Sequence, residues 1–84
     1  MHYEKIYLDI TVMFTADGKI VPQSFLWEGE SVEIDKVVGN TKAAPLYTGS
    51  FLTERYTCLV YGKERFLYFE PRSSRWFVEA RCAD

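Results

Sequence analysis

The sequence is poor in the side chains from which metal sites and catalytic sites are built. Its 84 residues include one histidine, His2, and two cysteines, Cys58 and Cys82. A zinc site needs about four such ligands, and a nucleophilic hydroxyl or thiol needs a base beside it. The spacing of calcium-binding loops and a glycine-rich phosphate loop are also missing. We therefore expect no enzyme activity, no catalytic residues, no metal site within one chain and no cofactor.

Long hydrophobic runs are missing too, although the chain is rich in hydrophobic residues. Hydrophobic residues make up 48% of the sequence and aromatic residues 17%, which excludes a disordered tail. No apolar run approaches the roughly 20 residues of a membrane-spanning helix. Residues 1–5 lack the apolar segment of a secretion signal. We expect one folded domain over residues 1–84, located in the cytoplasm, where a disulfide is not the default state of cysteine.

An excess of charge of one sign is absent as well. The 10 basic and 12 acidic residues give a net charge of −2, the wrong sign for a general binder of phosphate backbones. All five arginines nevertheless follow residue 50. Arginine binds anions and aromatic rings better than lysine does because its guanidinium group is planar. The simpler interpretation is that these arginines alternate with glutamates on solvent-facing strand positions and pair with them across strands.

Alternation of apolar and polar residues is the main pattern that the sequence does contain, and it predicts strands. Every even position from 6 to 14 is apolar, which places one face of a long first strand in the core. Similar patterns predict about six strands in all. They cover residues 4–14, 19–27, 31–38, 51–61, 65–70 and 75–81. No segment keeps a helical period, so we expect at most a single helical turn.

Turn residues separate the predicted strands and define the expected fold. Asp17 and Gly18 are typical of a tight hairpin, and Pro22, which lacks an N–H group, predicts a sheet edge or a bulge. Residues 39–50 are expected to form a loop that is long for a compact domain. We predict an all-β fold, a single small antiparallel barrel or roll of about six strands with meander connectivity, comparable in size to an SH3 domain. The alternative is an open two-layer roll in which the first strand crosses both halves.

Several stretches together resemble a known family. They are Asp17-Gly18-Lys19-Ile20-Val21-Pro22, Phe25-Leu26-Trp27-Glu28-Gly29, Leu67-Tyr68-Phe69-Glu70 and Arg75-Trp76-Phe77-Val78. Over roughly residues 10–80 the pattern resembles a small bacterial family of uncharacterised proteins. The resemblance implies a small β-barrel and an association with translesion-type DNA polymerases and repair proteins, but it implies no activity. Glu70 stands where aspartate is common in that family.

The alternation leaves an aromatic surplus on the face opposite the predicted core. The core is expected to hold Phe14, Phe25, Trp27, Tyr56, Phe69 and Trp76. The other face is expected to carry Tyr7, Phe66, Tyr68 and Phe77, with Arg55, Arg65 and Arg75 among them. An exposed apolar patch of this kind marks a partner surface. The first hypothesis is thus a non-catalytic module that binds protein partners or itself, as a homodimer, through this aromatic face. If the sheet rolls up, these side chains instead form a second small core.

A different function is compatible with the same residues. Aromatic rings beside arginines hold single-stranded nucleic acid by stacking on bases and contacting phosphates. The neighbouring glutamates oppose this, whereas the repair association implied by the resemblance supports it. The alternative hypothesis is therefore a single-stranded nucleic-acid-binding accessory domain linked to DNA repair.

Overall fold

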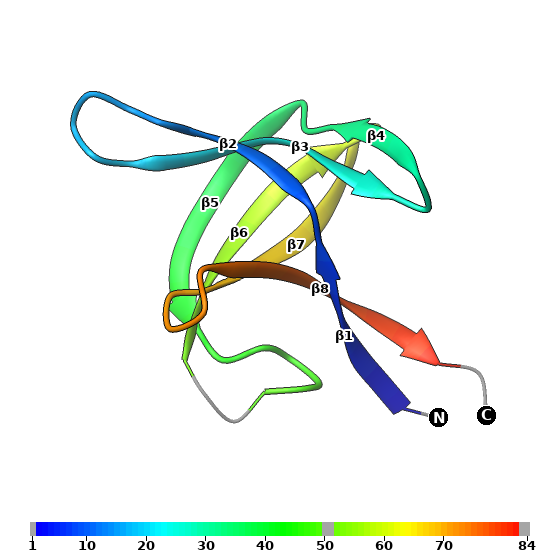
Figure 1. The fold of residues 1–84 in the computed structure, drawn as a ribbon. Coiled ribbons are helices and arrows are strands. Elements are labelled where there is room, and N and C mark those ends of the chain that lie inside the picture. The colour runs from blue at the N-terminus through cyan, green and yellow to red at the C-terminus, as the bar shows by residue number, and fades with distance from the viewer. Residues whose placement is uncertain (1, 50–51, 83–84) are drawn as a thin grey trace.

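The computed structural model describes residues 2–49 and 52–82, and these residues form strands and turns but no helix. The strands are β1 (His2–Leu8), β2 (Ile10–Phe14), β3 (Ile20–Trp27), β4 (Glu30–Glu33), β5 (Lys36–Ala43), β6 (Thr53–Val60), β7 (Lys63–Glu70) and β8 (Arg75–Cys82) (Figure 1). The prediction of an all-β protein is confirmed.

The eight strands build two antiparallel sheets rather than the single barrel or roll of about six strands that we predicted. The large sheet has five strands in the order β1-β8-β7-β6-β5, and the small sheet has three in the order β2-β3-β4. The chain begins in the large sheet, forms the small sheet, and then returns to complete the large one (Figure 1). This matches the alternative in which the first predicted strand contributes to both layers.

The count differs because two of the predicted strands are each divided at a corner. The first breaks at Asp9, whose carbonyl accepts a hydrogen bond from the Leu26 N–H at 2.9 Å. At the other corner the Ile34 N–H donates to the Gln23 carbonyl in the small sheet. The N–H of the next residue, Asp35, donates to the Leu59 carbonyl in the large sheet. Alternation predicts strand faces but carries no signal for a change of hydrogen-bonding partner, so the sequence did not indicate either corner.

The predicted loop at 39–50 is shorter than expected because its first part is strand. β5 continues to Ala43, which pairs with Thr53, and a bulge between Val37 and Gly39 adjusts the register. Gly39 and Asn40, which fall within the predicted loop, lie instead in this edge strand. The loop that remains, residues 44–49 in its described part, lies against the large sheet.

One irregularity and one turn follow directly from the residues that occupy them. Pro22 sits at an irregularity in the β2–β3 pairing, where the register shifts between Thr11 and Val12, as its missing N–H predicts. The β6–β7 hairpin turns through Tyr61 and Gly62, both with positive φ, at 51° and 74°. Two such residues define the turn that matches the twist of a hairpin, which is why glycine stands at the second position.

The core lies between the two sheets. Its fully buried members come from β6, β7 and β8 and are Tyr56, Cys58, Val60, Leu67 and Trp76. Phe25, Phe69 and Val32 are among the half-buried residues that pack on them. Core positions are therefore confirmed for Tyr56 and Trp76 and are wrong for Phe14, which is 71% exposed. Phe14 ends β2 on a hairpin that projects from the body, where no other element covers it (Figure 1).

Candidate interaction surface

Four predicted aromatic residues form one row across β1, β8 and β7 on the outer face of the large sheet. Tyr7 lies opposite Phe77, and Phe77 lies opposite Tyr68. The Tyr68 and Phe77 rings stack with centroids 5.3 Å apart. Tyr7 meets Phe77 edge-on at 5.7 Å, and Phe66 meets Tyr68 edge-on at 6.4 Å. The alternation thus correctly indicated which aromatic side chains share this face, and we call these residues the aromatic row.

The two central rings of the row are buried, contrary to the expectation that the whole row is exposed. Tyr68 is 1% exposed and Phe77 is 0% exposed, whereas Tyr7 and Phe66 at the ends are 40% and 38% exposed. The alternative of a second small core therefore describes Tyr68 and Phe77. The reason is that the Lys5 side chain and a loop cover the middle of the row.

Cationic side chains lie over three of the rings. The Arg75 guanidinium carbon is 3.8 Å from the centroid of Tyr7, and the Arg55 guanidinium carbon is 4.9 Å from that of Phe66. Lys5 Nζ lies 4.8 Å from the centroid of Phe77. A cation over a ring face is attracted by the ring quadrupole. The chain's own cations thus occupy ring faces that a nucleic-acid base would need.

Arg65 does not join this row, although we expected it on the same surface. It pairs across the sheet with Cys58, a core residue, so its side chain lies on the inner side of β7. The structure places Arg65 at the rim of a cleft instead.

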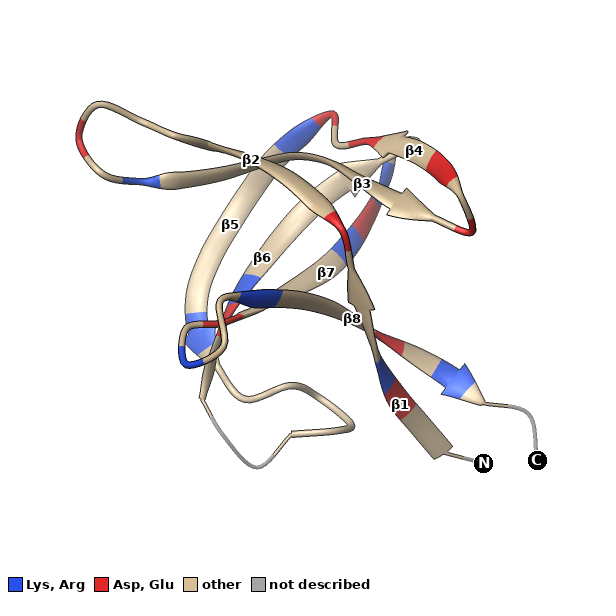
Figure 2. Cartoon of the chain, in the orientation of Figure 1, with Lys and Arg blue, Asp and Glu red and all other residues tan. Residues whose placement is uncertain are grey.

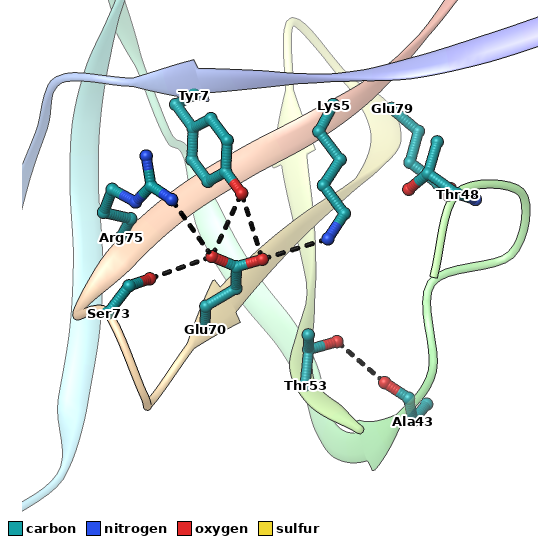
Figure 3. Close-up of polar contacts among 9 residues, drawn as sticks. All are labelled: Lys5, Tyr7, Ala43, Thr48, Thr53, Glu70, Ser73, Arg75 and Glu79. Atoms are coloured by element: carbon teal, nitrogen blue, oxygen red, sulfur yellow. Dashed lines mark hydrogen bonds and ion pairs between the residues drawn. The ribbon is translucent and has the colours of Figure 1, made fainter. Parts of the chain in front are cut away.

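One end of the row is organised around the Glu70 carboxylate (Figure 3). It accepts hydrogen bonds from Lys5 Nζ at 3.0 Å and from Ser73 Oγ at 2.9 Å. The Tyr7 hydroxyl donates to its two oxygens at 3.1 Å, and Arg75 lies 4.0 Å away. Partial burial alone would raise the pKa of Glu70, but these hydrogen bonds, first among them that from Lys5, outweigh it and lower the pKa.

The 44–49 loop is tied to the same face by the Glu79 carboxylate, which lies beside Thr48 (Figure 3). The backbone N–H groups of Tyr47 and Thr48 each donate to this carboxylate at 2.7 Å, and that of Leu46 donates at 3.1 Å. Successive N–H groups that converge on one anion form a nest, here occupied by a side chain of the protein itself.

Two packing contacts fix the shape of the 44–49 loop. The Tyr47 ring stacks on Tyr3 of β1, with centroids 3.9 Å apart and planes 10° apart. Gly49 packs on the ring of Pro45 so closely that a Cβ atom there would lie 2.2 Å from Pro45 Cδ. The loop is therefore a built cover for the aromatic row, and glycine at 49 is required by this close approach.

A cleft opens where β7 and β8 separate. The two strands pair only at Tyr68–Phe77, Phe69–Trp76 and Glu70–Arg75, next to the turn that joins them. Beyond that point they diverge, as Figure 1 shows. The cleft between them has a volume of about 650 Å³. Its lining includes Phe25, Trp27 and Val32 from the small sheet, Leu46 and Tyr47 from the loop, and Leu67 from β7.

Tyr68 lines this cleft, but its hydroxyl is buried and has no hydrogen-bond partner among the described residues. Burial raises the pKa of the phenol, and the nearby Arg55 guanidinium and Leu46 backbone offset part of the rise without adopting hydrogen-bond geometry. A buried hydroxyl without a partner is costly, and because this one is closed to solvent it is not open to the cleft.

This cleft is not indicated by any pattern in the sequence. The two segments that flank it read as ordinary strands joined by a tight turn, which predicts continuous pairing. The exposure of the aromatic residues at its rim is likewise a property of the structure that the sequence does not show.

Other chemistry of the described residues is limited. No group of three or more His, Cys, Asp or Glu within residues 2–49 and 52–82 is arranged to hold a metal ion. Within the same residues no helix has the length and apolar character needed to cross a membrane. Comparison with protein-family models, curated proteins and solved structures finds no match to this chain.

Proposed function

We propose that this domain is a non-catalytic interaction module that binds a protein partner in the cleft between β7 and β8. The observation that carries the proposal is the separation of these strands next to an apolar lining. The volume of about 650 Å³ leaves room for side chains of a partner. The lining also includes exposed aromatic side chains, with Tyr61 80%, Tyr47 59% and Phe66 38% exposed. Aromatic residues of this kind dominate the binding energy of protein interfaces.

The aromatic row has a supporting role in this proposal. Because Tyr68 and Phe77 are buried, the row serves mainly to hold the outer face together. Its exposed end at Phe66 belongs to the rim of the cleft. The partner surface predicted from the sequence is thereby narrowed to one end of the row and the cleft beside it.

Nucleic-acid binding receives less support from the geometry. Arg55 and Arg75 lie over rings of the chain itself. Acidic and basic residues are interspersed along β1, β7 and β8, and the charged residues on and beside β4 are acidic, so no basic stripe runs along these strands (Figure 2). The association with DNA repair, the bacterial origin and the cytoplasmic location stay predictions from the sequence.

The test uses display libraries of random peptides and of random proteome fragments, selected on the immobilised domain. Affinities of the enriched sequences are then measured in solution for the wild type, Phe66→Asp and Phe14→Asp. Phe66→Asp at the rim should weaken binding roughly tenfold or more, because hot-spot aromatics contribute that much. Phe14→Asp is the control, since Phe14 is more exposed but lies on the projecting hairpin. Failure to enrich any binder, or equal loss with both variants, would contradict the proposal.

A second copy of the chain is one form that the partner can take. Sedimentation equilibrium over a range of concentrations distinguishes this case. A homodimer formed through the cleft should dissociate in Phe66→Asp and persist in Phe14→Asp.

A further inference from the structure

We infer that the partner enters the cleft as an extended segment and adds as a strand to the free edge of β7. This inference rests on the proposed function and specifies the form of the partner. It is carried by three features of the cleft: an unpaired strand edge, two chemically different sides, and a cation at its rim.

The unpaired edge follows from the pairing of β7 with its two neighbours. β7 pairs with β6 from Lys63 through Phe69, but it pairs with β8 only from Tyr68 onward. Over residues 63–67 the edge that faces the cleft therefore has no ladder partner in the described part of the chain. In an antiparallel strand every second residue directs its N–H and C=O groups to a given edge. Such an edge is a template for an added strand.

The two sides of the cleft differ in the side chains that they would accept. Successive side chains of an added strand point to opposite faces of the sheet. On the inner side they would meet Phe25, Trp27 and Val32 of the small sheet, which favours apolar residues. On the outer side lies the exposed Glu64 carboxylate, which favours a polar or basic side chain. The partner segment should thus alternate apolar and polar residues.

The charge at the rim adds one further requirement. Arg65 is exposed, lines the cleft on the inner side of β7 and forms no ion pair within the described residues. Glu64 also lines the cleft, but strand alternation places it on the other side of β7. An acidic side chain in the partner, on its inner-facing side near Arg65, would complement the guanidinium group.

The binding mode is tested with peptides enriched in the display selection. Each peptide is synthesised with a single N-methylated amide, moved one position at a time along its length. In strand addition only alternate amides face β7, so methylation should weaken binding roughly tenfold or more at every second position and have little effect between them. Uniform tolerance or uniform loss in a peptide that still depends on Phe66 would overturn strand addition and leave the proposed function standing. Absence of any Phe66-dependent binder would overturn both.

The chemistry of the segment is tested with variants of the domain. Arg65→Glu should reverse the preference from a glutamate-containing peptide to its lysine counterpart, whereas Arg72→Glu, in the exposed β7–β8 turn, should not. Glu64→Gln should weaken peptides with a basic outer residue and leave peptides with an apolar outer residue unchanged, because it removes only the carboxylate charge. An unchanged charge preference in Arg65→Glu would overturn the acidic assignment, and unchanged affinity for the basic peptide in Glu64→Gln would overturn the polar one.

Discussion

The two faces of the large sheet bury aromatic side chains by different means. On the inner face Tyr56 and Trp76 are covered by a second sheet, through ordinary apolar packing. On the outer face Tyr68 and Phe77 are equally buried, but the cover consists of a short loop and of the Lys5 side chain laid over the Phe77 ring. The difference teaches that a small domain can build a second core without a second layer, provided that charged groups hold the cover in place.

The cleft lies where the two kinds of cover meet. The small sheet bounds its inner side and the 44–49 loop bounds its outer side, while the separation of β7 and β8 leaves the space between them open. Substitutions that loosen only one of these two covers can therefore show whether the stability of the domain and its binding of a partner depend on the same contacts.

The largest effect is expected on the inner face. Leu67→Ala removes a side chain that is 0% exposed and should lower the free energy of unfolding by about 3 kcal/mol, from lost burial and the cavity left behind. Urea unfolding measures this change. Leu52→Ala, at a residue that is 71% exposed, should be nearly neutral. A loss below about 1 kcal/mol at Leu67 would show that the inner face is less well packed than we describe.

A smaller effect is expected from releasing the cover of the outer face. Glu79→Gln removes the charge that accepts three backbone N–H groups of the 44–49 loop. We expect a loss of about 1–2 kcal/mol, together with faster proteolysis within the loop. The control is Glu30→Gln, at an exposed residue next to the β3–β4 turn. Equal behaviour of the two variants would mean that Glu79 does not hold the loop.

The Glu70 cluster should make part of the outer-face stability depend on pH. Its pKa is lowered in the folded protein, so its contribution is present above the ordinary value of 4.5 and is lost as the pH falls through the lower folded value. At neutral pH Glu70→Gln should be less stable than the wild type by about 1 kcal/mol. Urea unfolding well below pH 4.5 should find the two proteins nearly equal. A difference that does not change with pH would refute this role.

The smallest effect is expected from a cation at the exposed end of the row. Arg75→Ala removes the guanidinium group over Tyr7 and should cost about 0.5 kcal/mol, because the pair is open to solvent. Arg72→Ala in the neighbouring turn serves as the control, and thermal melting compares them. A cost above about 2 kcal/mol would indicate that the cations contribute more to the outer cover than exposed pairs normally do.

The sequence predicted the strands and the sharing of faces well, because both depend on alternation alone. It placed Tyr7, Phe77 and Tyr68 on one face, and the pairing confirms this. It could not predict the burial of the two central residues, since that depends on the 44–49 loop, whose hydrogen bonds to Glu79 span more than 30 residues of sequence.

The corners and the cleft were missed for a related reason. At Asp9 the alternation continues while the hydrogen-bonding partner changes, so a divided strand looks like one long strand. The separation of β7 and β8 is likewise a property of pairing, which the residues between Arg65 and Arg81 do not encode locally. Phe14 was assigned to the core by its even position, but the hairpin extends beyond the body that would cover it.

The most direct test of the account is amide hydrogen exchange along β7 and β8, measured residue by residue in the free domain and with a selected peptide. The account predicts that alternate amides within residues 63–67, those facing the cleft, exchange fast in the free domain although their neighbours, paired with β6, are protected. Bound peptide should protect those same amides. Slow exchange at every position of this segment in the free domain would contradict the account, because the edge that the partner needs would already be paired.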